Sequence, residues 1–347
     1  MPLLLPLHAQ VSSDTVRALE RVATSWMEKE HIPALSVAVG VGDAPAWTAA
    51  WGFTDLENFV PATPRSMFRI GSIAKTFTAV AALQLAEAGR LDLDAEVQAY
   101  VPSFPHKKWP ISVRQLLSHL AGIRNYQGDE FNSTRHYRSI EEALAVFAAD
   151  PLVHQPGSEY LYTTYGVNLA GAAVQSAAGV SYAELVRRNI IEPAGISSMR
   201  PDDVFAVIPY RARGYRRRAD GAIENCALLD TSNKLPGGGW EATAHDLVLF
   251  ARALFNGRLL KPDSLAAMWT PQKLNNGKPT GYGLGWGLYQ HQGVLVAEHS
   301  GTQPGIKAHL LAVPQRRIAI AVLTNLEDGR APEIAREMFA ALPEGSK

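Results

Sequence analysis

A serine and a lysine three residues apart stand at the start of an apolar segment, as Ser72 and Lys75 in the stretch FRIGSIAKTFT. Residues at this spacing share one face of a helix, so the two side chains are expected to lie together. A serine hydroxyl becomes a good nucleophile when a base takes its proton, and a buried lysine loses its charge more easily than an exposed one. A free N–H at the helix start would favour a developing oxyanion. The pattern indicates acyl transfer, although Ser-x-x-Lys also occurs where the serine only caps a helix.

The composition narrows the classes of function. The 347 residues carry 33 basic and 33 acidic side chains, and this balance argues against a nucleic-acid partner, which requires a basic surface. No apolar stretch reaches the roughly 20 residues of a membrane span. The single cysteine, Cys226, excludes an intrachain disulfide and a cysteine-based metal site, and the ten histidines show no metal-ligand spacing. We therefore expect no cofactor and no metal.

Several enzyme signatures are also absent from the sequence. It contains no His-Glu-x-x-His, no Gly-x-Ser-x-Gly, no P-loop and no complete Gly-x-Gly-x-x-Gly. A Rossmann oxidoreductase or an α/β-hydrolase therefore has little support.

The elements that would position these residues fall into three blocks along the chain. Hydrophobic periodicity predicts a helix, then two strands, at the beginning: 13–29, 33–40 and 46–53. The middle is mostly helical, with segments predicted at 73–88, 113–120, 139–150, 166–178, 182–189 and 243–257. The end returns to strands and a last helix: 281–289, 294–299, 307–313, 317–324 and 331–341.

This order predicts an α+β fold, an antiparallel sheet flanked by helices with an inserted helical domain. The sheet domain would combine residues 10–80 with 205–347, and the mainly helical domain would span 81–204. The two sheet segments must meet in space, and the boundary between sheet and helices is a natural place for a cleft.

Further segments, in order along the chain, resemble the serine β-lactamase and penicillin-binding protein superfamily. The resemblance is to its class C, esterase-like branch, with its mitochondrial and bacterial β-lactamase-like members, and it runs from about Ser13 to the last helix. The fold it implies is the β-lactamase/transpeptidase fold. The segments that carry it are GFTDLEN, the Ser-x-x-Lys stretch, AGRLDLD, LLSHLAGI, PGSEYLYTTYGV, GGGWEATAHDL, GLGWG and EHSG.

The resemblance implies roles for three side chains. Ser72 would be the acylated nucleophile, and Lys75 would help to deprotonate it. Tyr162 matches the tyrosine of the family's Tyr-x-Asn motif and would act as a general acid/base, including for the water that releases the acyl group. A phenol with a pKa near ~10 becomes a usable base beside cationic or hydrogen-bonding groups, and Lys75 could supply that charge.

The resemblance also implies the substrate-binding residues, and here the sequence departs from the family. Thr164 stands where the family has asparagine, and it lacks the amide's NH₂ donors. His299, Ser300 and Gly301 stand where many relatives have Lys-Thr-Gly. Thr302, which follows, would offer the second oxyanion N–H beside that of Ser72. Histidine titrates near neutral pH, so recognition of a substrate carboxylate is expected to weaken above pH ~7.

The sequence thus predicts a serine hydrolase that acts through an acyl-enzyme on amide or ester bonds. Because of Thr164 and His299, a peptidase or esterase with weak or no β-lactamase activity is favoured over an efficient β-lactamase or D-alanyl peptidase. An alternative of a different class is a retired enzyme that serves as a filament or scaffold protein. Three chemically competent motifs argue against retirement.

The expected partner is a small acyl substrate, a peptide, ester or β-lactam, and a homo-oligomer is possible. The first ten residues, MPLLLPLHAQ, are rich in Leu and Pro and carry no Lys or Arg. They fit the end of a trimmed export leader as well as an irregular N-terminus. The expected compartment is periplasmic or secreted, with the cytoplasm as the alternative.

Overall fold

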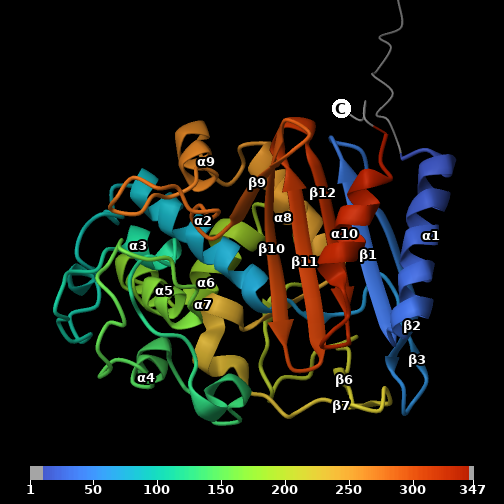
Figure 1. The fold of residues 1–347 in the computed structure, drawn as a ribbon, viewed down its shortest axis with the longest axis horizontal. Coiled ribbons are helices and arrows are strands. Elements are labelled where there is room, and N and C mark those ends of the chain that lie inside the picture. Colours follow the sequence, from blue (N-terminus) through green and yellow to red (C-terminus); the bar gives the residue numbers. More distant parts are fainter. Residues whose placement is uncertain (1–10, 344–347) are drawn as a thin grey trace, which may run out of the picture.

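A seven-stranded antiparallel sheet forms the centre of the computed structural model, which describes residues 11–343 (Figure 1). The predicted leader lies outside the described residues. The strand order is β3-β2-β1-β12-β11-β10-β9, so the first and last strands of the chain pair at the middle, with Leu35 opposite Thr324. The strands are β1 (Ala34–Val41), β2 (Trp47–Asp55), β3 (Val60–Pro61), β9 (Gly287–His291), β10 (Val294–Gln303), β11 (Ile306–Val313) and β12 (Ile318–Thr324).

Two helices from opposite ends of the chain cover one face of this sheet. They are α1 (Ser13–Glu30) and α10 (Ala331–Ala340), and they share a core with alternate residues of β1, β11 and β12 (Figure 1). The helix α1 begins where the predicted pattern begins, because the Ser12 hydroxyl accepts the Thr15 N–H at 3.2 Å. The opposite face packs on α8 (Ala244–Phe255), which the capping box of Thr243 and Asp246 starts.

The helical part of the molecule lies beyond the β9–β10 edge of the sheet (Figure 1). At its centre is α2 (Ala74–Glu87), which is buried on nearly every side against α5 (Thr164–Ala178) and α7 (Leu235–Gly238). The other α-helices are α3 (Val113–Leu117), α4 (Ile140–Leu144), α6 (Tyr182–Val186) and α9 (Pro262–Met268).

Short elements connect these parts. A small sheet, β4-β8-β5, joins the segment before α2 to the segment before α8, and a hairpin pairs β6 with β7. Their bounds are β4 (Phe68–Arg69), β5 (Arg200–Pro201), β6 (Tyr215–Arg217), β7 (Ile223–Asn225) and β8 (Trp240–Ala242). Single 3-10 or π turns are η1 (Gly71–Ile73), η2 (Val97–Ala99), η3 (Gly128–Asn132), η4 (Arg187–Ile191), η5 (Thr231–Lys234) and η6 (Pro314–Arg316).

The α+β expectation is confirmed, and several local predictions are wrong, three of them near the site or the helical part. Residues 281–286 form no strand, and the edge strand β9 begins only at Gly287. The strand predicted to stop at His299 continues to Gln303, and the turn falls at Pro304–Gly305, where Gly305 has φ +78°. The helix after Ser139 ends at Leu144 rather than before Pro151.

The domain division into 10–80 with 205–347 and 81–204 stays a prediction. None of the helices between residues 11 and 343 is long and apolar enough to cross a membrane.

Candidate active site

A pocket of about 450 Å³ opens where the β10 edge of the sheet meets the helical part of the molecule. Six of the predicted site residues line it: Ser72, Tyr162, Thr164, His299, Ser300 and Thr302. The fold therefore brings together residues that lie as far apart in the chain as Ser72 and Thr302. The pocket is completed by Asn125, Tyr126, Phe131, Tyr160, Tyr282, Gly287 and Glu298, which the sequence did not single out.

The pair that the spacing predicted is in contact. Ser72 lies in the single turn η1 and Lys75 in the first turn of α2, and Lys75 Nζ is 2.8 Å from Ser72 Oγ. The same Nζ lies 2.7 Å from the Gly237 carbonyl oxygen and 3.2 Å from Thr164 Oγ1. Lys75 is fully buried.

The surroundings of Lys75 favour its neutral form. Burial lowers its pKa well below the ordinary value, and the charge of Lys234 lowers it further. Among the described residues, no carboxylate pairs with it. A neutral amine has two N–H groups and one lone pair. It can donate to the Gly237 carbonyl and to Thr164 and still accept the proton of Ser72.

A close backbone crossing sets Ser72 beside β10. Gly71 has φ +51°, and a Cβ atom built on it would lie 2.9 Å from the Thr302 nitrogen. A Cβ atom built on Gly301 would lie 1.9 Å from the Ile70 carbonyl oxygen. Glycine is required at both positions, because any side chain would push the two segments apart. The crossing therefore places the backbone of Thr302 directly against the turn that carries Ser72.

Tyr162 faces both members of the pair. Lys75 Nζ is 5.1 Å from the centre of its ring, and its hydroxyl hydrogen-bonds to Ser72. Burial nevertheless raises the pKa of Tyr162 above its ordinary value, and the bond to Ser72 offsets only part of this rise. Burial thus favours the protonated phenol, and the general acid/base role of Tyr162 stays a prediction.

Thr164 occupies the place of the family's asparagine, and two unpredicted side chains adjoin it. The Thr164 backbone N–H donates to Asn125 Oδ1 at 3.2 Å, and its hydroxyl meets both Lys75 and Tyr126. Asn125 and Tyr126 come from the loop after α3, just beyond the LLSHLAGI segment, and no role was predicted for them from the sequence. The Asn125 amide thus brings to the pocket the type of group that Thr164 lacks.

The His299 side chain lines the pocket, and it is uncharged there. Burial lowers its pKa to about 3, and the charge of Lys75 contributes. Its Nδ1 lies 2.8 Å from the Ser300 carbonyl oxygen, which can only accept, so Nδ1 holds the proton. Its Nε2 accepts the Tyr282 hydroxyl at 2.8 Å. The expected titration of His299 near pH 7 is therefore wrong, because its two partners suit the neutral ring.

Ser300 and its neighbours form a second polar group on the other face of β10. The Ser300 hydroxyl is 2.9 Å from Nδ1 of His309, a fully buried residue directly opposite it on β11. His309 Nε2 faces Glu298 Oε2 at 3.3 Å without the geometry of a hydrogen bond. Glu298 also pairs with Arg336 of α10. The hydrogen bond to His309 thus holds the Ser300 side chain, and the next residue, Gly301, lies at the backbone crossing with Gly71.

Other sequence candidates are structural. His119 is buried, its ring centre 4.2 Å from that of Tyr162, and its Nδ1 accepts the Thr163 N–H. Trp240 is buried against Tyr182, and Trp286 packs on Phe250. The basic run Arg216–Arg218 is ion-paired on the exposed β6–β7 hairpin. Between residues 11 and 343, no cluster of three histidine, cysteine or acidic side chains could hold a metal ion.

A serine whose neighbouring base is a buried lysine rather than a histidine is typical of the Ser-x-x-Lys serine hydrolases. This class acts on amide or ester bonds, and the comparison with known proteins gives the particular family.

The chain belongs to the beta-lactamase family, whose sequence model matches residues 19–342. It is 27% identical to the human mitochondrial serine beta-lactamase-like protein LACTB, over 85% of this chain and 74% of that protein. The octameric penicillin-binding protein homologue from Pyrococcus abyssi superposes with a TM-score of 0.80 at 25% identity, covering 94% of this chain and 76% of the other. A D-stereospecific amidohydrolase from Streptomyces gives 0.79 at 25% identity, covering 95% and 99%. The protein is a serine hydrolase with the β-lactamase/transpeptidase fold.

Proposed function

We propose that this protein hydrolyses small esters or amides through an acyl-enzyme formed on Ser72. The observation that carries the proposal is the 2.8 Å contact between Ser72 Oγ and the buried Nζ of Lys75. Ser72 Oγ would attack the carbonyl carbon while its proton passes to the lone pair of Lys75. A base whose pKa is lowered by burial can take this proton near neutral pH.

The oxyanion that forms would be held by two backbone N–H groups, those of Ser72 and Thr302. The crossing of Gly71 and Gly301 supports this assignment, because it sets the two segments in van der Waals contact. Donors fixed in this way need no rearrangement during the reaction, and removal of one such donor costs about 10²–10³ in rate in other hydrolases.

The leaving group needs a proton when the tetrahedral intermediate collapses. We assign this donor role to Tyr162, since burial keeps its phenol protonated and its hydroxyl contacts Ser72. The leaving amine or alcohol departs with that proton, and the acyl group stays on Ser72. Lys75 would then return a proton to Tyr162 and act as the base toward the water that releases the acid.

We propose that the substrates are neutral around the scissile bond, and that peptidase or esterase activity exceeds β-lactamase activity. His299 is uncharged, so it offers no fixed cation for the carboxylate of a β-lactam. Thr164 replaces the family's asparagine, and Asn125 lies beside it to bind an acyl amide. The Streptomyces relative is named for hydrolysis of amides with D-stereospecificity, which makes D-amino acid amides the first compounds to assay.

Covalent labelling tests the assignment of the nucleophile. A fluorophosphonate probe is expected to label the wild-type protein once, at Ser72, and Ser72→Ala is expected to lose both labelling and hydrolysis of p-nitrophenyl acetate. The control is Ser300→Ala, which removes the other pocket serine and is expected to keep the label. Labelling that persists in Ser72→Ala would falsify the proposal.

A substrate panel tests the class. Short p-nitrophenyl esters and D- and L-amino acid amides are expected to be turned over faster than nitrocefin, and the reverse order would make this protein a β-lactamase. Size-exclusion chromatography with light scattering, run beside the labelling, addresses the scaffold alternative: a large polymer without labelling would favour it. The same measurement tests the predicted homo-oligomer, and cell fractionation tests the predicted periplasmic or secreted location.

A further inference from the structure

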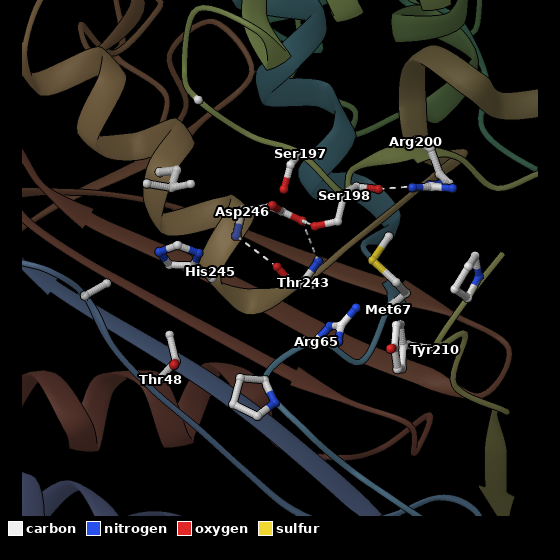
Figure 2. A pocket seen from close by; sticks show the side chains of 15 residues that line it. Thr48, Arg65, Met67, Ser197, Ser198, Arg200, Tyr210, Thr243, His245 and Asp246 are labelled. Atoms are coloured by element: carbon white, nitrogen blue, oxygen red, sulfur yellow. Dashed lines mark hydrogen bonds between the residues drawn. The ribbon is translucent and has the colours of Figure 1, made fainter.

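A second cavity, of about 640 Å³, shares no lining residue with the Ser72 pocket. Figure 2 shows the side chains that line it. Its walls come from the start of β2, the loop before β4, the loops before β5 and β6, and the beginning of α8. Cavities that bind small molecules are of this size. The family's acyl-transfer chemistry uses none of these residues.

Two arginines line this cavity without a carboxylate partner. The Arg65 guanidinium lies over the Tyr210 ring at 4.3 Å from its centre, and Arg200 Nε donates to the Ser198 carbonyl oxygen at 2.9 Å. Within residues 11–343, neither arginine has an ion pair, and their remaining N–H groups have no protein acceptor. A guanidinium keeps its charge at every physiological pH and presents five donors in a planar fork that fits carboxylates and phosphates.

The cavity's own carboxylate forms no ion pair with either arginine. Asp246 is buried, and its Oδ2 accepts the Ser198 hydroxyl at 2.5 Å and the Thr243 N–H at 3.0 Å (Figure 2). Asp246 is therefore committed to capping α8. His245, the residue before Asp246 in the first turn of α8, adds a further nitrogen donor or acceptor and no negative charge.

Apolar groups lie beside the two arginines. Met67 lies between Arg65 and Arg200 in the view of Figure 2, and the Tyr210 ring, Leu249 and two prolines also belong to the lining. A bare inorganic ion would leave this surface uncovered. A ligand that combines an oxyanion with an apolar ring or chain would satisfy both parts of the lining.

We propose that this cavity binds a small organic anion, whose carboxylate or phosphate group pairs with Arg65 and Arg200 and whose apolar part packs on Tyr210 and Met67. Carboxylates and phosphates share the oxyanion chemistry that the arginines recognise, and the experiment distinguishes them.

Isothermal titration calorimetry on the Ser72→Ala protein tests this site with three matched probes: phenyl phosphate, phenylacetate and neutral phenylacetamide. At least one of the two anions is expected to bind saturably, and at least tenfold more tightly than phenylacetamide. The tighter of the two identifies the anion class. The double variant Arg65→Gln/Arg200→Gln is expected to weaken anion binding at least tenfold.

Two controls keep the test decisive. Arg21→Gln, on the exposed side of α1, removes one charge elsewhere and is expected to leave the affinity unchanged. The double variant with Ser72 restored is expected to hydrolyse p-nitrophenyl acetate at the wild-type rate, which shows that it folds. Absence of saturable binding by both anions, equal affinity for phenylacetamide, or unchanged affinity in the folded double variant would each overturn the proposal.

Discussion

The two cavities of this protein differ in the burial, and therefore in the charge, of their basic side chains. In the Ser72 pocket, the cation that matters is fully buried, and desolvation moves the pKa of Lys75 toward a range where it can exchange protons. In the second cavity, Arg65 and Arg200 keep contact with solvent, and their charge is fixed. Burial thus favours the neutral amine of Lys75, which can accept a proton, whereas the partly exposed arginines keep the charge that binding an anion requires. The following variants test this contrast, in order of decreasing effect.

Lys75→Met is expected to lower the hydrolysis of p-nitrophenyl acetate at least 10³-fold, because Ser72 loses its base. The same change is expected to leave the free energy of unfolding unchanged or to raise it by about 1 kcal/mol, since a buried amine with no carboxylate partner is replaced by an apolar side chain. Activity assays and urea unfolding measure the two effects. Arg65→Gln is the control, with activity within twofold of wild type. If the Lys75→Met protein kept most of its activity, Lys75 would not be the base that activates Ser72.

Gly301→Ala is expected to lower activity at least tenfold and stability by about 1–3 kcal/mol, because its Cβ atom would collide with the Ile70 carbonyl and open the crossing that holds Thr302 beside Ser72. Gly281→Ala is the matched control: its Cβ atom would meet nothing closer than 3.8 Å. Kinetics and thermal unfolding of both variants check this. Equal effects at the two glycines would contradict the role of the crossing.

Tyr282→Phe is expected to cost about 1 kcal/mol of stability and to raise KM a few-fold with little change in kcat. The reason is that His299 Nε2 loses its hydrogen-bond donor while the ring stays in the pocket wall. Tyr289→Phe serves as the comparison, because it removes a hydroxyl on β9 that donates to the partly exposed Glu298. A large loss of kcat in Tyr282→Phe would instead place its hydroxyl in the chemical step.

The pH dependence gives the smallest expected effect. The folded-state pKa of His299 is about 3, so the ring has already lost its proton well below neutrality and loses none as the pH rises from 6 to 8. The ratio of kcat/KM for an anionic ester to that for its neutral analogue is therefore expected to change less than about threefold over this range. Had the ring kept the ordinary pKa of roughly 6.5, the ratio would fall as the proton left. A tenfold fall in this ratio, centred near pH 6.5, would show that His299 is charged below that pH.

Much of this arrangement follows from local sequence patterns. The contact between Ser72 and Lys75 depends on helical spacing alone, and the caps at Ser12 and Thr243 fix where α1 and α8 begin. Period-two and apolar runs located β1, β2, β11 and β12. These features could be predicted because each is decided by residues within a few positions of one another.

The features that the sequence missed depend on what packs around a residue. The charge of His299 is removed mainly by burial, and the hydroxyl that its Nε2 accepts comes from Tyr282, seventeen positions away. The protonation of Tyr162 follows from burial in the same pocket. Asn125 and Tyr126 reach the site from a loop with no periodicity. The predicted strand stopped before Gly301, although Gly301 marks a close approach of two segments inside a strand.

The pairing of β1 with β12 also has a consequence for biosynthesis. Leu35 and Thr324 are 289 positions apart (324 − 35), so the middle of the sheet cannot close until the residues up to Thr324 have left the ribosome. Contacts of such long range make folding slow, and an N-terminal strand without its neighbour exposes a hydrophobic edge. Since β10 belongs to the same late block, Ser72 is synthesised long before the strand that packs against its turn. We expect the Ser72 pocket, and with it the activity, to form only once β10 and β12 have joined the sheet.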